Sequence, residues 1–201
     1  MSTKAGSERT VRTLVYLALL IQVAAIVYSL SLTASLELYT VVRAAALLGY
    51  VGLFWLIVSS EYVREMRKVF GRVYLKVHHP LAVVTWVLIV AHPLSYALLV
   101  SDPKVLLPVL WPLRRFLELG GRAALYLFAL ASVTAIVRRS LKKSWRYVHR
   151  LSFLAFPLVF IHAWLIGSDL ISPLLQVIWV AMAVVVLVIT VHKVFLRGRA
   201  G

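Results

Sequence analysis

The sequence predicts an all-α fold, a bundle of six transmembrane helices, from three observations. Of the 201 residues, 62% are hydrophobic and 14% are charged, whereas soluble domains have about 45–50% and about 25%. The apolar residues gather into six long stretches. The charge is strongly positive: the chain has 22 Lys and Arg residues but only 7 Asp and Glu residues, and its formal net charge is +15. These observations exclude a water-soluble globular protein and favour the lipid bilayer, not nucleic acid, as the basic residues' partner.

Each apolar stretch is close to the roughly 20 residues that a helix needs to cross a bilayer. The first is too long for the apolar part of a signal peptide and is expected to be retained. The long connection 101–121 contains three Pro residues and a Trp, which is typical of a re-entrant or interfacial segment. We interpret 1–201 as one transmembrane domain. The predicted spans are 13–33, 39–60, 75–100, 122–138, 146–167 and 172–195.

The positions of Lys and Arg predict the orientation of the spans. Seventeen of them lie before the first span, between the second and third, around the junction of the fourth and fifth, or after the sixth. Four lie around segment 101–121, and Arg43 lies inside the second span. Because cytoplasmic loops carry the excess of Lys and Arg, we expect both termini in the cytoplasm and a multi-pass protein of the cell membrane.

Residue types that are missing narrow the chemistry. The chain has no Cys, which excludes disulfides, thiolate metal ligands and covalent heme attachment through a CxxCH motif. No glycine-rich nucleotide-binding motif lies between a strand and a helix, so the chain binds no nucleotide by those means.

Five of the six His residues lie in the third and fifth predicted spans. His78 and His92 are 14 residues apart, a helical rise of about 21 Å, and His149 and His162 are 13 apart, about 19.5 Å. Both spans run from inside to outside. His78 and His149 are therefore expected at one depth near the cytoplasm, and His92 and His162 at another near the outer face.

Two imidazoles at one depth can hold a heme iron from opposite sides, and helical bundles build such sites in their cores. The sequence thus predicts two b-type hemes, with His79 as an alternative to His78. Fourteen residues return to within about 40° of one helix face, whereas 13 end about 140° away. We expect Pro157 to change the winding between His149 and His162. A metal site without heme is less favoured, because no carboxylate in the spans is near.

Two motifs carry a resemblance to a known family: KVHHPLAVVTWVLIVAHPLSYALL in the third span and WRYVHRLSFLAFPLVFIHAWL in the fifth. They resemble the ferric-reductase-like transmembrane family, which includes ferric reductases, NADPH oxidases and the heme-binding membrane subunit of the bacterial periplasmic methionine sulfoxide reductase system. The resemblance covers about 39–167. It implies bis-His ligation of b-type heme by the third and fifth helices.

The resemblance also implies that Arg43, in VVRAAALLGYVGL, lies near a heme propionate. Two departures are visible: Ala82 replaces the Gly usual four residues after the first His, and His78 and His79 stand where the sulfoxide reductase subunit usually has Arg. We also expect Arg150 to hold an inner propionate, and Phe156 and Trp86 to line the hemes. The arginines Arg114, Arg115 and Arg122 are expected at the outer interface, with contact to the outer propionates as the alternative.

The function expected from these features is electron transfer across the membrane to an outer-face acceptor such as ferric iron, oxygen or a partner oxidoreductase. No flavin- or NAD(P)H-binding domain follows the last span, so electrons are expected from a separate flavin reductase, a bound FMN or a quinol. The alternatives are a quinol-linked cytochrome b anchor subunit and a small-solute transporter or membrane scaffold that binds no heme. We also expect His192 to be an interfacial residue.

Overall fold

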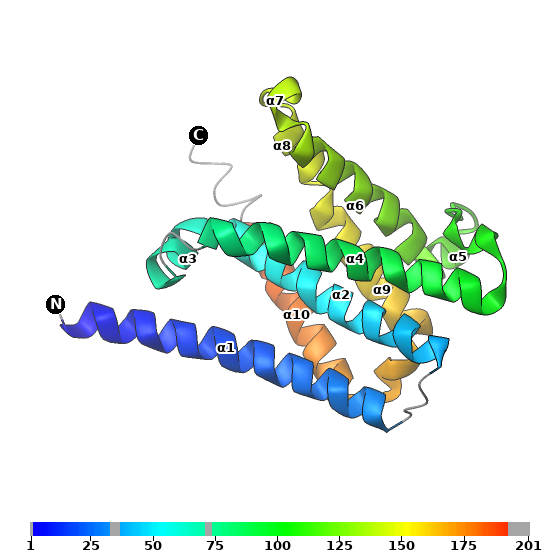
Figure 1. Cartoon of the computed structure of the whole chain (residues 1–201), viewed down its shortest axis with the longest axis horizontal. Helices are drawn as coiled ribbons and strands as arrows, with labels where there is room; N and C mark the ends of the chain where they lie inside the picture. The colour runs from blue at the N-terminus through cyan, green and yellow to red at the C-terminus, as the bar shows by residue number, and fades with distance from the viewer. Residues whose placement is uncertain (1, 33–36, 71–73, 193–201) are drawn as a thin grey trace.

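The computed structural model describes residues 2–32, 37–70 and 74–192 (Figure 1). These residues form α-helices and short 3₁₀ turns and no strand. In chain order the elements are α1 (Ser2–Ser31), α2 (Leu38–Glu61), α3 (Val63–Phe70), α4 (Tyr74–Val100), η2 (Pro103–Leu106), α5 (Leu113–Glu118), α6 (Gly120–Ile136), α7 (Arg138–Leu141), α8 (Trp145–His149), α9 (Ser152–Ile166), η3 (Ser168–Ile171) and α10 (Pro173–Val191).

The all-helical prediction is confirmed for the described residues. Within the described residues, five helical stretches are long and apolar enough to cross a membrane: Ser7–Ser31, Leu38–Glu61, Val77–Val100, Trp145–Ile166 and Pro173–Val191. The predicted span 122–138 corresponds to α6, an apolar helix of 17 residues that is shorter than these five. Residue 33 of the first predicted span and residues 193–195 of the last lie outside the described residues.

A change of winding in the fifth predicted span was expected at Pro157. In the structure it lies at Arg150 and Leu151 instead. A 3₁₀ turn advances 120° per residue instead of 100°, so each residue wound this way adds about 20°. The tight turn therefore reduces the angular mismatch between His149 and His162, and Pro157 lies inside the continuous helix α9. The i→i+3 backbone bonds that mark the turn are Leu151 N–Val148 O, Phe153 N–Arg150 O and Leu154 N–Leu151 O.

Helix α2 forms the centre of the fold and is the most buried of the long helices. Its most extensive contact is with α4, and the second large contact in the molecule joins α6 to α9. The backbones of α2 and α4 come close at Gly52. The approach is so close that a Cβ at this position would collide with the side chain of Thr85. Two helix pairs, α2/α4 and α6/α9, therefore face each other and leave the interior space between them.

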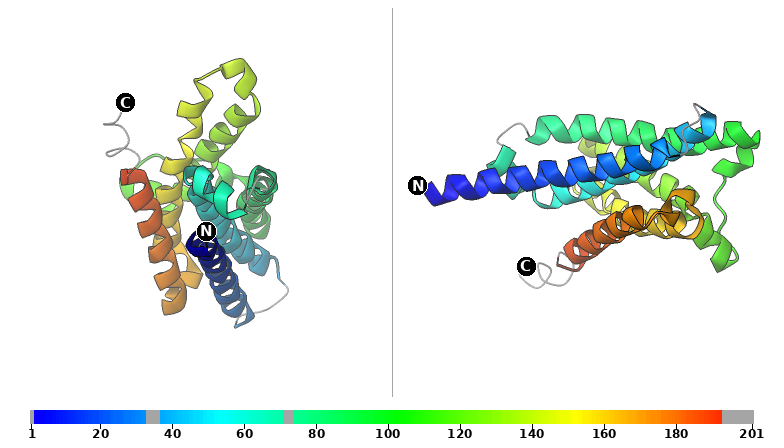
Figure 2. Two further views of the ribbon diagram at one scale, coloured as in Figure 1. Left: turned by 90° about the vertical axis from the view of Figure 1, so that its left-hand side faces the viewer. Right: turned by 90° about the horizontal axis from the view of Figure 1, so that it is seen from below.

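The remaining elements surround these two pairs. Helix α1 packs against α2, and its N-terminal part extends beyond the other helices, whereas α10 contacts α1, α2 and α9 (Figures 1 and 2). The turn from α7 to α8 projects away from the bundle. At the opposite end, the segment 101–119 exposes apolar side chains, and 82% of Trp111 is accessible. The interfacial location expected for this segment stays a prediction.

Candidate functional site: a cavity between two histidines

A cavity of about 450 Å³ lies between the α2/α4 pair and the α6/α9 pair. This volume is within the range of about 300–1,000 Å³ that is usual for small-molecule and cofactor sites. Its wall is mostly apolar, with small residues from α2 and α6 and two histidines from α4 and α9. The charged residues in the wall are Arg43, Arg122 and Asp169.

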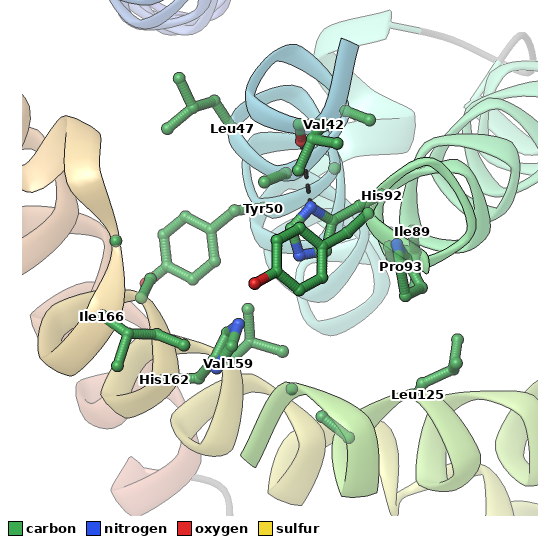
Figure 3. Close-up of a pocket in the computed structure, with 18 of the residues that line it drawn as sticks. Val42, Leu47, Tyr50, Ile89, His92, Pro93, Leu125, Val159, His162 and Ile166 are labelled. Atoms are coloured by element: carbon green, nitrogen blue, oxygen red, sulfur yellow. Dashed lines mark hydrogen bonds between the residues drawn. The ribbon is translucent and has the colours of Figure 1, made fainter. Parts of the chain in front are cut away.

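His92 of α4 and His162 of α9 point into this cavity from opposite walls (Figure 3). Nδ1 of His92 lies 3.0 Å from the carbonyl oxygen of Val42, and Nδ1 of His162 lies 2.7 Å from that of Glu118. A carbonyl oxygen accepts but cannot donate, so each Nδ1 carries the proton and donates it. In the neutral ring Nε2 then presents its lone pair, which is the arrangement that prepares an imidazole for a metal ion.

The carbonyl that orients His162 is available for a local reason. Glu118 is the last residue of the short helix α5, and the last carbonyls of a helix have no partner within it. The next helix, α6, begins at Gly120, so the chain passes close to the end of α9. Gly121 makes this approach possible, because a Cβ there would lie 2.8 Å from Cδ2 of His162.

The spacing of the two imidazoles matches a metal placed between them. Their ring centres are 6.4 Å apart, and their planes are inclined by 68°. An imidazole nitrogen binds a transition metal at about 2.0–2.1 Å, and a five-membered ring with C–N bonds of about 1.33 Å has a radius of about 1.1 Å. Two imidazoles that coordinate one ion from opposite sides would therefore have their centres about 6.2–6.4 Å apart.

The donor set indicates which kind of metal group fits. Among the described residues, no group of three or more His, Asp or Glu side chains could hold a metal ion. Two imidazoles alone leave the coordination sphere of a protein metal incomplete. A metal whose remaining ligands belong to a planar macrocycle is complete with two axial imidazoles, so the residues present fit a heme better than a bare ion.

The second predicted histidine pair lies toward the opposite end of α4. Nδ1 of His149 donates to the carbonyl oxygen of Ala131 at 3.0 Å, the same arrangement as in His92 and His162. His149 lies near enough to His78 for the two imidazoles to interact electrostatically. His78 is half-buried and His79 is exposed, with their rings 6.0 Å apart. Of the two neighbours His78 is thus the more buried, and its pairing with His149 stays a prediction.

Arg43 lines the cavity, and its partner in the structure is an aspartate. Its Nε donates to Oδ2 of Asp169 at 2.9 Å, and its Nη2 donates to Oδ1 of the same carboxylate and to the backbone oxygen of Ser29. The hydroxyl of Ser29 donates to Asp169 at 3.0 Å. This buried ion pair connects α1, α2 and the turn η3 that joins α9 to α10.

The other residues that the sequence suggested for cofactor contact lie elsewhere. Trp86 packs on Phe128 with ring centres 5.7 Å apart, Phe156 stacks on Tyr50 at 4.8 Å, and neither Trp86 nor Phe156 lines the cavity. Arg150 is exposed and lies over the ring of Tyr147. The expectation that Trp86 and Phe156 line a heme stays a prediction, because burial in an apolar helix is as well explained by packing between helices.

Two features of the site had not been expected from the sequence, and a third only as an alternative. Asp169 was not among the candidate residues, and Arg122 was expected at the interface with propionate contact as the alternative, yet both line the cavity. The close approach of Gly121 to His162 was also missed. A signal was present, since a Gly pair directly before an apolar stretch is typical of a close backbone contact. For Asp169, the one acidic residue between the last two spans was the available signal.

Comparison with known proteins adds no family assignment. No family model and no curated protein matches this sequence.

Proposed function

We propose that this chain spans the membrane six times, with both termini in the cytoplasm, and transfers electrons across it through two bis-His b-type heme sites. The outer site is His92 with His162, and the inner site is His78 with His149. On this proposal the chain is a membrane component of an oxidoreductase and belongs to the ferric-reductase-like family that its motifs resemble.

The relation between His92 and His162 carries the proposal. Each ring is oriented by a backbone carbonyl at Nδ1, which leaves Nε2 for a metal, and the ring centres are 6.4 Å apart. Both rings line one mostly apolar cavity. Bound heme iron would supply one-electron redox chemistry, and the protein's part is to hold it, orient it and exclude water.

Support for the inner site is of the same kind. His149 is oriented through Nδ1 by Ala131, and it interacts with His78, which lies 14 residues before His92 in the same helix α4. A helical rise of about 21 Å separates His78 from His92. Two sites at these depths would divide the bilayer, which is about 30 Å thick in its hydrocarbon core, into short electron-transfer steps.

The electron donor and acceptor are proposed by chemical class. The donor is a separate flavin reductase, bound FMN or quinol on the cytoplasmic side, and the acceptor is ferric iron, oxygen or an oxidoreductase at the outer face. The positive-inside distribution of Lys and Arg supports an orientation with the His78/His149 site nearer the cytoplasm.

The decisive experiment is a heme count on the full chain purified in detergent, by the pyridine hemochrome method with protein quantitation. We expect about two b-type hemes per chain in the unaltered protein. His92→Ala and His162→Ala should each abolish the outer heme, and His78→Ala and His149→Ala the inner one. His79→Ala and His192→Ala are matched controls, because both side chains are exposed. A colourless protein that takes up no added heme would refute the proposal.

A further inference from the structure

Two arginines line the cavity between His92 and His162, and their charges are balanced differently. The charge of Arg43 is neutralised inside the protein by the carboxylate of Asp169, in a pair that is buried at both ends. The same carboxylate also accepts a hydrogen bond from Ser29. Arg43 and Asp169 together therefore contribute no net charge to the cavity wall.

Arg122 has no such partner among the described residues. Its Nη1 donates to the carbonyl oxygens of Lys104 and Leu107, at 3.3 and 3.2 Å. The nearest acid along the chain, Glu118, is engaged by Arg114 at 3.0 Å and by Arg115 at 3.6 Å. Arg122 and His162 line the same cavity, so a net positive charge lies in the wall that also carries this imidazole.

A cation in a membrane-embedded wall is costly unless it is paired. The two carbonyl dipoles compensate the charge of Arg122 in part, but a carboxylate forms a stronger, charge-assisted pair with a guanidinium. The remaining wall is mostly apolar. The cavity thus fits a ligand with a large apolar body and an anionic edge near Arg122, and the two propionates of a b-type heme lie on one edge of an apolar ring.

We infer that Arg122, and not Arg43, binds the propionate of the outer heme. The inference rests on the proposed function and deepens it. Arg43 instead holds α1, α2 and η3 together through Asp169. Arg122 is a positioning residue: it sets which edge of the porphyrin faces the 101–119 end of the cavity, next to the loop carbonyls that it already contacts.

The test compares two porphyrins with the same iron and ring but different edges: hemin and its dimethyl ester, which has no carboxylates. Full-length chain, purified in detergent without heme, is titrated with each, and the affinity is measured from the absorbance change. His149→Ala is present in all samples, so that the outer site alone is titrated. The unaltered outer site should bind hemin about 10- to 150-fold more tightly than the ester, since a hydrogen bond to a charged group contributes about 1.5–3 kcal/mol.

The variant Arg122→Gln should lose this preference, with weaker binding of hemin and unchanged binding of the ester. Arg122→Lys should keep most of it, and Arg115→Gln is the matched control, because that side chain is 66% exposed and paired with Glu118. The inference is overturned if the unaltered site binds both porphyrins equally, a result that needs no variant to fold. It is also overturned if Arg122→Gln weakens the binding of hemin and of the ester equally, since Arg122 then only holds the loop in place. A third contrary result would be that Arg43→Gln, and not Arg122→Gln, removes the preference for hemin. Failure of both porphyrins to bind the unaltered site overturns the proposed function itself.

Discussion

Gly121 and His162 are in closer contact than any other residue type at position 121 would allow. A Cβ at Gly121 would lie 2.8 Å from Cδ2 and 3.0 Å from Nε2 of His162. The ring cannot simply rotate away, because its Nδ1 is held by the carbonyl of Glu118 at 2.7 Å. The nitrogen proposed to bind iron is therefore positioned from two sides, by a hydrogen bond and by a glycine.

The first prediction follows from this contact. Gly121→Ala should weaken heme binding at the outer site by about 5- to 150-fold, since overpacking costs about 1–3 kcal/mol. Heme titration of the purified chain measures the effect. Gly49→Ala is the control, because Gly49 also lines the cavity but a Cβ there meets Ile89 at an ordinary 3.4 Å. Equal affinities for Gly121→Ala and the unaltered chain would show that His162 is free to shift.

A second prediction concerns the buried pair of Arg43 and Asp169. Asp169→Asn leaves the Arg43 charge buried without its counter-charge and should lower the free energy of unfolding by about 3–5 kcal/mol. Thermal unfolding in detergent measures this as a lower midpoint. Glu118→Gln is the matched control, since its partners Arg114 and Arg115 are exposed and such a pair contributes about 0–1 kcal/mol. If both variants unfold at the same temperature, the buried pair does not hold α1, α2 and η3 together.

The third prediction is a gain in stability. Tyr50 is 2% exposed, and its hydroxyl has no hydrogen-bond partner among the described residues. Its ring stacks on Trp179 at 4.6 Å and on Phe156 at 4.8 Å. Tyr50→Phe keeps both stacking contacts and removes the unpartnered hydroxyl, so it should stabilise the fold by about 1–3 kcal/mol. Tyr50→Leu loses the stacking and should destabilise it. A lower unfolding midpoint for Tyr50→Phe would mean that the hydroxyl has a partner after all.

The fourth prediction tests the contact between α2 and α4. Gly52→Ala forces a methyl group against the side chain of Thr85 and should destabilise the fold by about 1–3 kcal/mol. Adding Thr85→Ala removes the Oγ1 and Cγ2 atoms that collide, so the double variant should regain part of the loss. Unfolding midpoints of the two single variants and the double variant form the required cycle. If the change in midpoint of the double variant equals the sum of the changes in the two single variants, Gly52 and Thr85 are not in contact.

The histidine pairs show how far sequence reasoning extends in this protein. Helical rise and the one-sided distribution of Lys and Arg predicted one depth for His92 and His162, and the structure brings their rings together. The winding of the helix between His149 and His162 could not be predicted from the sequence. A 3₁₀ turn at Arg150 and Leu151 depends on the packing of α8 and α9 against α6, whereas Pro157 was the visible candidate in the sequence.

The residues that pair with the charged side chains could not be predicted from the sequence either. Arg43 and Asp169 are 126 residues apart, and no local pattern connects a guanidinium in one helix with a carboxylate in a distant turn. Phe156 and Trp86 illustrate the same limit, because an aromatic residue in an apolar helix has several possible neighbours and the sequence does not choose among them. The stacking of Tyr50 on Phe156 and Trp179 results from the packing of the helices.

The sequence by itself determined the helical class and the five long apolar helices of the described residues, and it predicted a depth for each histidine, because hydrophobicity and helical rise act along the chain and need no partner. Only the tertiary structure decided which groups face one another: the carbonyls that orient His92 and His162, the aspartate that neutralises Arg43 and the glycine beside His162. These contacts depend on distances between helices, and such distances are set by side-chain packing across the whole bundle.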